Sequence, residues 1–364
     1  MKIVSYKLIL FFLLISFQGI CQKDVFIVKL QPTEKVEPGR FFISKVIDNR
    51  AVKDNIGIIQ RGMANKKLTA NFELPFEEEL QQTFNVLLPP GAGKDSLVAS
   101  ITMLNISEKT GSMSETGASN VEIEFLRLID NQLYSIGNYT ATVEGKGLDV
   151  TRKHGERIIE ALTQIIKKVS PDLEKEPSTL VIKDLQLEKH KIDFSAPVSK
   201  GLYYNFGSVS SNKPADSMDY TVKMIAETKK INHYQVYHGQ SKKRIKHLYG
   251  FSDGTDFYLS SSEYVQEGYF VKSKLMGRFI YFEDQFSNPT ASAAFGAIGA
   301  LASNKYSGIV LDRTTGMVTV LNQKNTVNLL ASYPVLLERY KSGKKEVEDV
   351  RDIILELNKS EMIE

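Results

Sequence analysis

The stretch 151-TRKHGERIIEALTQIIKKV-169 is the clearest structural signal in this chain of 364 residues. Its apolar side chains recur at spacings of three and four residues, which places them on one face of an α-helix. They are Ile158, Ile159, Leu162, Ile165, Ile166 and Val169, whereas the charged residues Arg157, Glu160, Lys167 and Lys168 lie off this face. A helix of this kind buries its apolar face against another element. We therefore expect it to lie on a β-sheet.

Strand patterns precede this helix, rich in β-branched and aromatic residues, at residues 25–30, 41–47, 96–104, 121–129 and 133–143. A further helix is expected to begin near Pro75, because Phe76, Leu80, Phe84 and Leu87 recur at helical spacing. Within 121–129, apolar and acidic residues alternate until Leu126, which predicts a strand whose later half is covered on both faces. Residues 24–169 are expected to form an α/β-sandwich-like domain.

The chain from residue 201 onward differs in composition and pattern, because Tyr and Phe recur and turn residues separate short strand candidates. Turn signals at residues 252–255, 276–277 and 313–316 predict antiparallel strand pairs. Two amphipathic helices are expected to end the chain, the last with Val347, Val350, Ile354 and Leu357 on one face.

The segment between these two regions contains Pro171, Pro177 and Pro197 and only one short strand candidate, at residues 180–183. We interpret residues 170–200 as a linker. The sequence thus predicts an α+β protein of two domains, at residues 24–169 and 201–364. The second is expected to be an antiparallel β-rich domain with terminal helices.

Residues 1–21 have the pattern of a secretory signal peptide. Lys2 and Lys7 precede an apolar run at residues 8–17, and Gly19 and Cys21 occupy the third and first positions before Gln22. About ten apolar residues are too few to span a bilayer permanently. We therefore expect export to the periplasm, to the outer membrane or out of the cell.

Cys21 is the only cysteine of the chain. Cleavage after Cys21 would leave a mature chain with no thiol, whereas acylation would make Cys21 its first residue and a lipid anchor. The lipoprotein pattern has an aliphatic residue three positions before the cysteine and a small one just before it, where this chain has Gln18 and Ile20. Cleavage is favoured, and Cys21 is kept as a candidate lipidation site.

The charge balance excludes an electrostatically driven partner. The formal net charge is +3 and falls to +1 when Lys2 and Lys7 leave with the leader. Basic and acidic residues are interspersed, so nucleic acid is not an expected partner. The Gly93-Lys94 pair lacks the spacing of a phosphate-binding loop, because Leu88 stands where that loop has glycine and Asp95 where it has a hydroxyl residue.

The candidate site residues are few. His233 and His238 are five positions apart, so on one strand they point to opposite faces and do not form a metal pair. Asp253 and Asp256 bracket Gly254 and are explained by turn chemistry better than by acid–base catalysis. No cofactor or metal is expected, and these four residues are kept only as weak candidates for a catalytic site.

The segment 290-TASAAFGAIGALAS-303 has no charge and carries a small residue every fourth position. This spacing is typical of helices that pack closely in membranes. Fourteen residues extend about 21 Å as a helix, short of a hydrocarbon core of about 30 Å. A buried or mobile helix is therefore favoured over membrane contact.

Two regions resemble known families. Ile47-Asp48-Asn49-Arg50 followed by Ile56-Gly57-Ile58 resembles Gram-negative putative outer-membrane and transport-auxiliary lipoproteins, in which a strand ending in Asp-x-Arg precedes a short strand with glycine. This resemblance covers roughly residues 40–169. The C-terminal region, with Gly201-Leu202-Tyr203 and its Tyr-rich hairpins, is similar to secreted domains of unknown function. Neither resemblance implies a catalytic residue.

The function expected from these observations is that of an exported, non-catalytic protein of the cell envelope. Its aromatic second domain would bind or assemble with an envelope protein, a glycan or a lipid surface. The alternative is a hydrolase of envelope polymers with its site in residues 201–364. Membrane contact through Cys21 or residues 290–303 is a third hypothesis.

Overall fold

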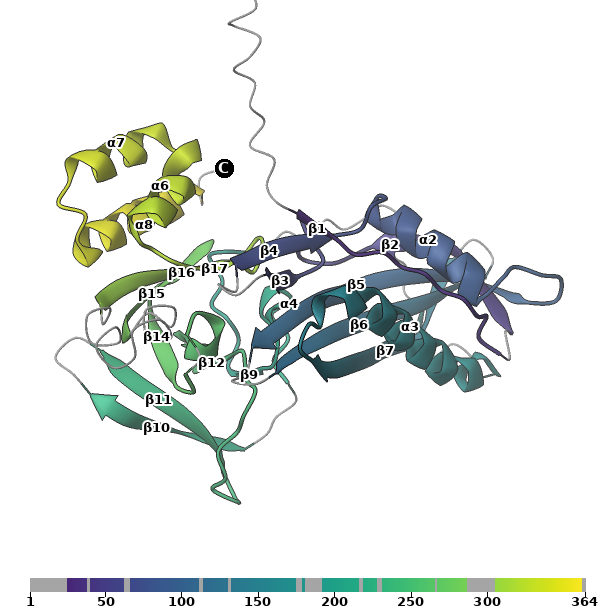
Figure 1. The fold of residues 1–364 in the computed structure, drawn as a ribbon. Coiled ribbons are helices and arrows are strands. Elements are labelled where there is room, and N and C mark those ends of the chain that lie inside the picture. Colours follow the sequence, from purple (N-terminus) through teal and green to yellow (C-terminus); the bar gives the residue numbers. More distant parts are fainter. Residues whose placement is uncertain are drawn as a thin grey trace, which may run out of the picture.

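The structure, a computed structural model, describes residues 25–37, 40–61, 66–110, 114–129, 132–174, 179–180, 192–215, 219–227, 231–265, 267–286 and 305–361. Within these residues the chain is an α+β protein, as the sequence predicts (Figure 1). Residues 1–21, including Cys21, and the segment 290–303 lie outside the described residues, so the expectations for a signal peptide and for a small-residue helix concern residues that the structure does not describe. We refer to the described residues of 25–180 as the N-terminal half and to those of 192–361 as the C-terminal half.

A five-stranded sheet forms the centre of the N-terminal half. Its order is β2 (Phe41–Asp48), β5 (Asp95–Thr110), β6 (Glu115–Ile129), β7 (Gln132–Gly147) and β8 (Thr179–Leu180). Strands β2 and β5 are parallel and the other pairs are antiparallel. A small second sheet has the order β1 (Val25–Ile27), β4 (Lys66–Asn71) and β3 (Ile58–Arg61). Of the strand predicted at residues 180–183, only Leu180 is described. It belongs to β8, which extends the first sheet.

Two helices share one core with this sheet, α2 (Phe76–Leu87) and α3 (His154–Val169). The predicted helix at 151–169 is present, although residues Thr151–Lys153 form a 3-10 turn before it. Ile158 and Leu162 on α3 are fully buried with Phe125 on β6. On the opposite face of the sheet, Leu126 packs in a small separate cluster. Both faces of β6 are therefore covered at Phe125 and Leu126, but the prediction is wrong for the end of the strand, because Leu128 is 53% exposed.

Arg157 corrects one prediction, because it is buried rather than on the solvent side of α3. Its guanidinium passes over Gly117 on β6, where a β-carbon would lie 2.8 Å from Cζ. Nη1 and Nη2 donate to the carbonyl of Val150, at 3.0 and 2.9 Å. The glycine leaves room for the guanidinium over the sheet, and the carbonyl accepts one hydrogen bond from each terminal nitrogen.

His154 and Glu108 complete this buried polar group. His154 Nε2 lies 3.0 Å from Glu108 Oε1, and its Nδ1 lies 3.2 Å from Arg157 Nη1. A neutral imidazole protonated at Nε2 donates to the carboxylate and accepts from the guanidinium, so both contacts are satisfied. Burial lowers the pKa of His154, the contact with Glu108 raises it in part, and Arg157 lowers it further.

In the described part of the chain, the C-terminal half contains an antiparallel sheet of nine strands. Seven follow one path, β17 (Val318–Val320), β16 (Lys305–Asp312), β15 (Phe279–Phe286), β14 (Phe270–Leu275), β13 (Phe257–Ser260), β12 (Gly250–Ser252) and β9 (Gly201–Tyr203). Strand β11 (Asn232–His238) pairs with β14 and with β10 (Tyr220–Glu227), which lies at an edge. The predicted turns at residues 252–255, 276–277 and 313–316 each join two strands of this sheet.

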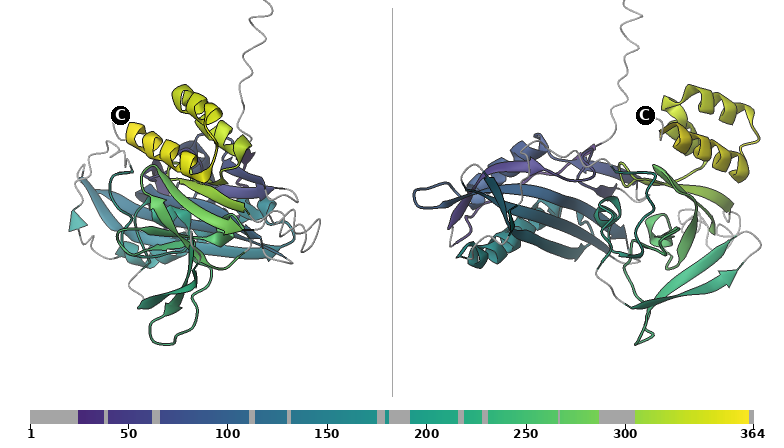
Figure 2. Two further views of the ribbon diagram at one scale, coloured as in Figure 1. Left: turned by 90° about the vertical axis from the view of Figure 1, so that its left-hand side faces the viewer. Right: turned by 180° about the vertical axis from the view of Figure 1, so that it is seen from behind.

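Helices flank this sheet. A short helix, α4 (Phe206–Ser210), follows β9, and the chain ends with α6 (Gln323–Leu329), α7 (Pro334–Ser342) and α8 (Val347–Glu361). The C-terminal helices gather at one corner of the molecule (Figure 2). They pack on β15 and β16 through a core that includes Tyr281, Tyr340 and Ile354. The sequence predicts two of these three helices; α6 has seven residues, too few for a clear apolar period.

The loop after β2 connects the two halves. Arg50 donates to both carboxylate oxygens of Asp48, from Nε at 2.8 Å and from Nη2 at 2.9 Å. Its third nitrogen donates to the carbonyl of Asn55, at 2.8 Å. Asn55 Nδ2 in turn donates to the carbonyl of Thr315 in the C-terminal half, at 3.0 Å. The Asp-x-Arg motif is therefore a buried ion pair that shapes the loop between the halves.

We expect Arg50→Ala to lower the free energy of unfolding by about 3–5 kcal/mol, because it leaves the buried Asp48 carboxylate without its ion partner. Urea denaturation measures the change. The matched control is Arg152→Ala, whose side chain is 89% exposed, and its expected change is below about 0.5 kcal/mol. Equal losses in the two variants would contradict a structural role for the Asp48–Arg50 pair.

The lowered pKa of His154 predicts a pH dependence of stability. Between its folded value and the unfolded value of about 6.5, the unfolded state binds more protons. The free energy of unfolding should therefore fall as the pH drops below about 6.5, by at most about 1.4 kcal/mol per pH unit from this group. His154→Gln should flatten this slope in urea denaturation between about pH 7.5 and 5.5. An unchanged slope in the variant would show that another group is responsible.

Candidate functional site

The structure does not bring the four candidate residues of the sequence together. His233 and His238 lie near opposite ends of β11, where they face Ala226 and Tyr220 of β10. Five residues of strand separate them by about 16 Å. Asp253 and Asp256 lie in the turn between β12 and β13. Among the described residues, no group of three or more His, Cys, Asp or Glu side chains could hold a metal ion.

Asp253 organises the turn that contains it. Its Oδ1 accepts from the amides of Thr255 and Asp256, at 2.9 and 2.8 Å, and its Oδ2 accepts from the Tyr258 hydroxyl, at 3.0 Å. Partial burial raises the pKa of Asp253, but these hydrogen bonds outweigh it and leave the pKa below its usual range. Asp256 forms an ion pair with Lys272, at 2.7 Å. The Asp253 carboxylate therefore stabilises the turn, and its lowered pKa does not suit it to general acid catalysis. The Asp256 carboxylate is paired with a lysine of β14.

His233 belongs to a different cluster, centred on the fully buried Asp284 of β15. His233 Nε2 lies 2.8 Å from Asp284 Oδ1. The hydroxyls of Tyr264 and Tyr269 donate to Oδ2, at 2.8 and 2.7 Å. The amide of Gln285 donates to Oδ1, at 2.7 Å. The His233 ring also stacks on Tyr269, with ring centroids 3.7 Å apart.

The Asp284 cluster has the parts of a histidine–carboxylate pair, which can act as a general base. Burial, together with the charge of Asp284, raises the pKa of Tyr264 and of Tyr269, so both remain hydrogen-bond donors. Each Asp284 oxygen accepts two hydrogen bonds, and this is what a buried carboxylate needs for stability. The sequence gives no signal for this cluster, because Asp284 stands 51 positions from His233 and only the pairing of β11, β14 and β15 brings them together.

A cavity of about 40 Å³ lies between the two halves. The N-terminal half lines it with residues of β3, β4 and β5, and the C-terminal half with residues next to β9, β12 and the 3-10 turn Ser261–Glu263. The polar and aromatic side chains that line it include Lys67, Asn105, Glu108, Tyr204, Tyr249 and Glu263. We call it the interdomain cavity.

Lys67 crosses between the halves at this cavity. Its Nζ donates to the backbone carbonyl of Glu263, at 2.5 Å, and lies 3.8 Å from the Glu263 carboxylate. Burial lowers the pKa of Lys67, and the charge of Glu263 offsets this in part. Two further buried atoms here, the Tyr249 hydroxyl and Asn105 Oδ1, have no hydrogen-bond partner in the part of the chain that the structure describes.

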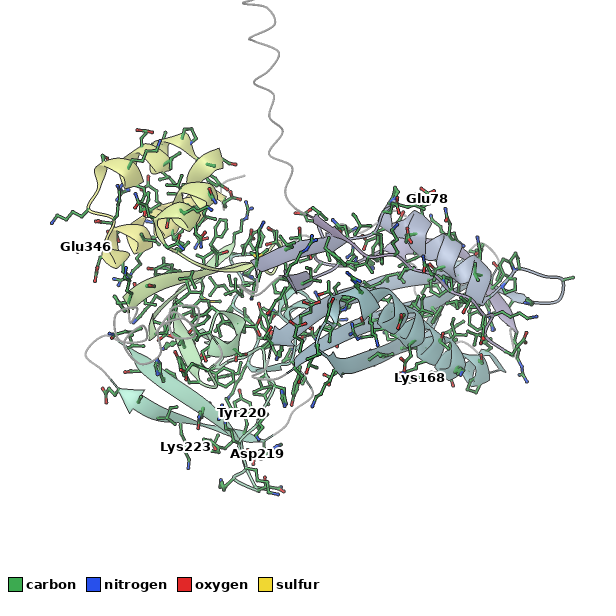
Figure 3. All side chains as sticks on the ribbon, in the orientation of Figure 1. Glu78, Lys168, Asp219, Tyr220, Lys223 and Glu346 are labelled. Atoms are coloured by element: carbon green, nitrogen blue, oxygen red, sulfur yellow. The ribbon has the colours of Figure 1, made fainter. Side chains whose placement is uncertain are left out.

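Strand β10 exposes three apolar side chains within four positions. Val222, Met224 and Ile225 are 40, 50 and 46% exposed. Tyr220 anchors the beginning of the strand by donating to the carbonyl of Ser252, at 3.3 Å. Figure 3 labels Tyr220 and Lys223 on this strand, at the border of the molecule away from the terminal helices. Exposed apolar side chains grouped on one strand mark a contact surface.

Comparison with known proteins gives a family for part of the chain. Residues 201–361, less than half of the chain, match a family of unknown function (DUF6563). No curated protein matches the chain. Among solved structures, the chain is similar to the crystal structure of protein XCC0632 from Xanthomonas campestris, which carries the family model DUF330. The identity is 11%, the TM-score is 0.24, and the match covers 40% of this chain and 91% of that one.

The family match agrees with the expectation that the C-terminal half is similar to a domain of unknown function. A TM-score this low supports no conclusion about fold or function. The resemblance of residues 40–169 to envelope lipoproteins stays a prediction. In the described residues, no helix is long and apolar enough to cross a membrane.

We expect Asp284→Asn to lower the free energy of unfolding by about 3 kcal/mol, because the amide nitrogen replaces one oxygen and cannot accept the two hydrogen bonds that this oxygen receives. Chemical denaturation measures the loss. Glu267→Gln is the control, since Glu267 is exposed in the same region, and its expected change is below about 0.5 kcal/mol. A neutral Asp284→Asn substitution would contradict a stabilising role for the cluster.

Proposed function

We propose that the protein is an exported, non-catalytic binding or assembly module of the cell envelope, and that strand β10 is its contact surface for a protein partner. The observation that carries the proposal is the exposure of Val222, Met224 and Ile225 on an edge strand. Methionine and apolar residues of this kind form the centre of protein interfaces. In contrast, the Asp253 carboxylate is occupied in its turn, Asp256 in an ion pair with Lys272, and His233 in the Asp284 cluster.

The local geometry favours contact through side chains over continuous strand addition. The register of β10 and β11 shifts between Met224 and Ala226, which marks a β-bulge. A bulge and an edge lysine such as Lys223 both hinder the pairing of a further strand. Lys223 and Glu227, both exposed, add charges of both signs beside the apolar side chains. We therefore propose a partner with an apolar protein surface bordered by charges.

Export is the second part of the proposal and is supported by the leader at residues 1–21. Cleavage after Cys21 would release the protein into the periplasm or beyond, whereas acylation of Cys21 would hold it at a membrane. Neither route requires a membrane-spanning helix in the mature chain.

A hydrolase of envelope polymers is the second candidate, and the contact between His233 and Asp284 is the observation that favours it. His233→Gln keeps a donor for Asp284 but removes the second ring nitrogen that a general base would use. Release of soluble fragments from purified peptidoglycan by the wild type and not by this variant would favour catalysis. Absence of release by both would favour the binding module.

The β10 surface predicts a site-specific cross-link. A photoreactive residue at Met224, introduced in the native host, should give a discrete adduct with one envelope protein, or with a second copy of the chain if the module assembles with itself. The matched control is Val335 on α7, which is 79% exposed and outside the surface, and should give no discrete adduct. Val222→Lys should remove the Met224 adduct. No adduct at Met224, or equal adducts at both positions, would contradict the proposal.

A further inference from the structure

The hairpin of β10 and β11, together with the loop that follows it, concentrates the positive charge of the chain. Residues 219–247 contain seven Lys and Arg against two acidic residues, Asp219 and Glu227. The excess of five exceeds the formal net charge of the whole chain, which is +3. The rest of the sequence therefore carries a small net negative charge, and the overall balance conceals this concentration. We call residues 219–247 the cationic hairpin.

The cationic hairpin exposes lysines that the fold does not pair. Four of its lysines are exposed: Lys223 on β10, and Lys242, Lys243 and Lys246 in the loop after β11. Among the described residues, none of these four side chains forms an ion pair with a carboxylate. Arg244, in contrast, donates to a backbone carbonyl. Like charges without counter-charges repel one another, so a partner that supplies carboxylates stabilises this surface.

Backbone hydrogen bonds fix the loop that carries three of these lysines. The amide of Lys242 donates to the His238 carbonyl, at 3.0 Å, and the amide of His238 donates to the Lys243 carbonyl, at 2.9 Å. The amide of Ile245 donates to the Val236 carbonyl, at 2.9 Å, and both side chains are buried in one core cluster. Lys242 has a φ of +54°, so the chain places a cation where glycine would be less strained. The loop presents its lysines from an ordered backbone, which lowers the entropic cost of binding.

The loop and the exposed apolar side chains of β10 belong to one surface. The amide of Gly239 donates to the carbonyl of Asp219, at 2.8 Å, and Tyr220 of β10 pairs with the last residue of β11. Val222 follows two positions later, about 7 Å along the strand. Figure 3 labels Asp219, Tyr220 and Lys223 at the same border of the molecule. A partner that covers β10 therefore also reaches the cations of the loop.

Apolar side chains in the middle of β10 favour a protein partner over other anions. Val222, Met224 and Ile225 would stay exposed against an anionic glycan or a nucleic acid, because such polymers bind through charges, hydrogen bonds and ring stacking. A bilayer admits apolar groups that project at an end, whereas the residues that follow β10 are Thr228-Lys229-Lys230. A protein surface covers apolar side chains at its centre and pairs with charges at its rim.

The same charge disfavours a two-fold symmetric contact with a second copy of the chain. Such a contact would place the cationic hairpins of two chains against each other. Each hairpin carries an excess of five positive charges, and like charges in contact are destabilising. The surface therefore suits a different protein.

We infer that β10 and the loop after β11 bind a different protein, whose contact surface is an apolar patch bordered by several Asp or Glu side chains. The apolar patch covers Val222 and Met224, and the carboxylates pair with Lys223, Lys242 and Lys243. This inference rests on the proposed function, because it names the chemistry of the partner at the same surface.

Cross-linking in the native host tests this inference through charge. The photoreactive residue at Met224 is combined with a reversal of the three loop lysines: Lys242→Glu, Lys243→Glu and Lys246→Glu. We expect the yield of the Met224 adduct to fall about ten-fold or more, because like charges then face the acidic rim of the partner. The matched control makes the same change in net charge at three exposed lysines of the C-terminal helices and their loops: Lys324→Glu, Lys344→Glu and Lys345→Glu. Its Met224 adduct should form with unchanged yield.

Mass spectrometry of the adduct identifies the partner and the peptide joined to Met224. We expect Asp and Glu beside the joined position, and their replacement by Lys should restore the adduct of the triple Glu variant. A misfolded variant would not regain the adduct through a change in its partner, so restoration supports the charge contact. Absence of restoration, equal yields from the wild type and the triple variant, or an adduct of two copies of this chain would each overturn the inference and leave the contact at β10 in place. No Met224 adduct in the wild type would overturn both proposals.

Vesicles test the alternative of a lipid surface. Purified residues 22–364 should not sediment with vesicles of phosphatidylglycerol and phosphatidylcholine at physiological salt concentration. Sedimentation that the triple Glu variant loses and the control variant keeps would assign the cations to an anionic membrane and overturn the acidic protein partner.

Discussion

The buried ion pair between Asp48 and Arg50 constrains the loop through which β2 and the strands after it contact the C-terminal half. Arg50 fixes the loop after β2, and its contact with the Asn55 carbonyl presents the Asn55 amide to Thr315 of the C-terminal half. The same loop leads to Gly57, whose φ of +134° and close approach to Ile106 exclude a β-carbon. An ion pair out of water is stable only when its hydrogen bonds are complete, and here the guanidinium also lies 3.6 Å from the ring centroid of Phe76. The Asp-x-Arg motif with its following glycine therefore has a physical explanation that requires no ligand.

The side chains discussed above fall into two groups. One group is satisfied inside the protein: Glu108 with His154, Asp284 with His233 and two tyrosines, and Asp253 in its turn. These residues stabilise the fold, and chemistry that changed their charge would disturb it. The second group has two parts. At the interdomain cavity, buried polar atoms lack a hydrogen-bond partner among the described residues, and on β10 apolar side chains are exposed. This second group supports the proposed binding function, because a partner could cover these side chains without breaking the hydrogen bonds of the first group.

The parts of the fold that depend on local patterns were predictable from the sequence. Helix α3 follows from its apolar period, and the turn after β12 follows from Ser252-Asp253-Gly254-Thr255. The burial of Arg157 was not predictable, because it requires Gly117 on a strand 40 positions earlier in the chain. The Asp284 cluster and the interdomain cavity were not predictable for the same reason. Strand register brings the residues of the cluster together, and the contact between the halves brings those of the cavity together. Local spacing carries no information about such contacts.

The central proposal is that the protein is a binding module that is exported and works outside the cytoplasm. Fractionation of the native host, combined with the intact mass of the protein in each fraction, tests that claim directly. The account predicts a chain beginning at Gln22 in the periplasm or medium, or one beginning at an acylated Cys21 in a membrane fraction. A full-length chain with residues 1–21 intact in the cytoplasm would contradict the account.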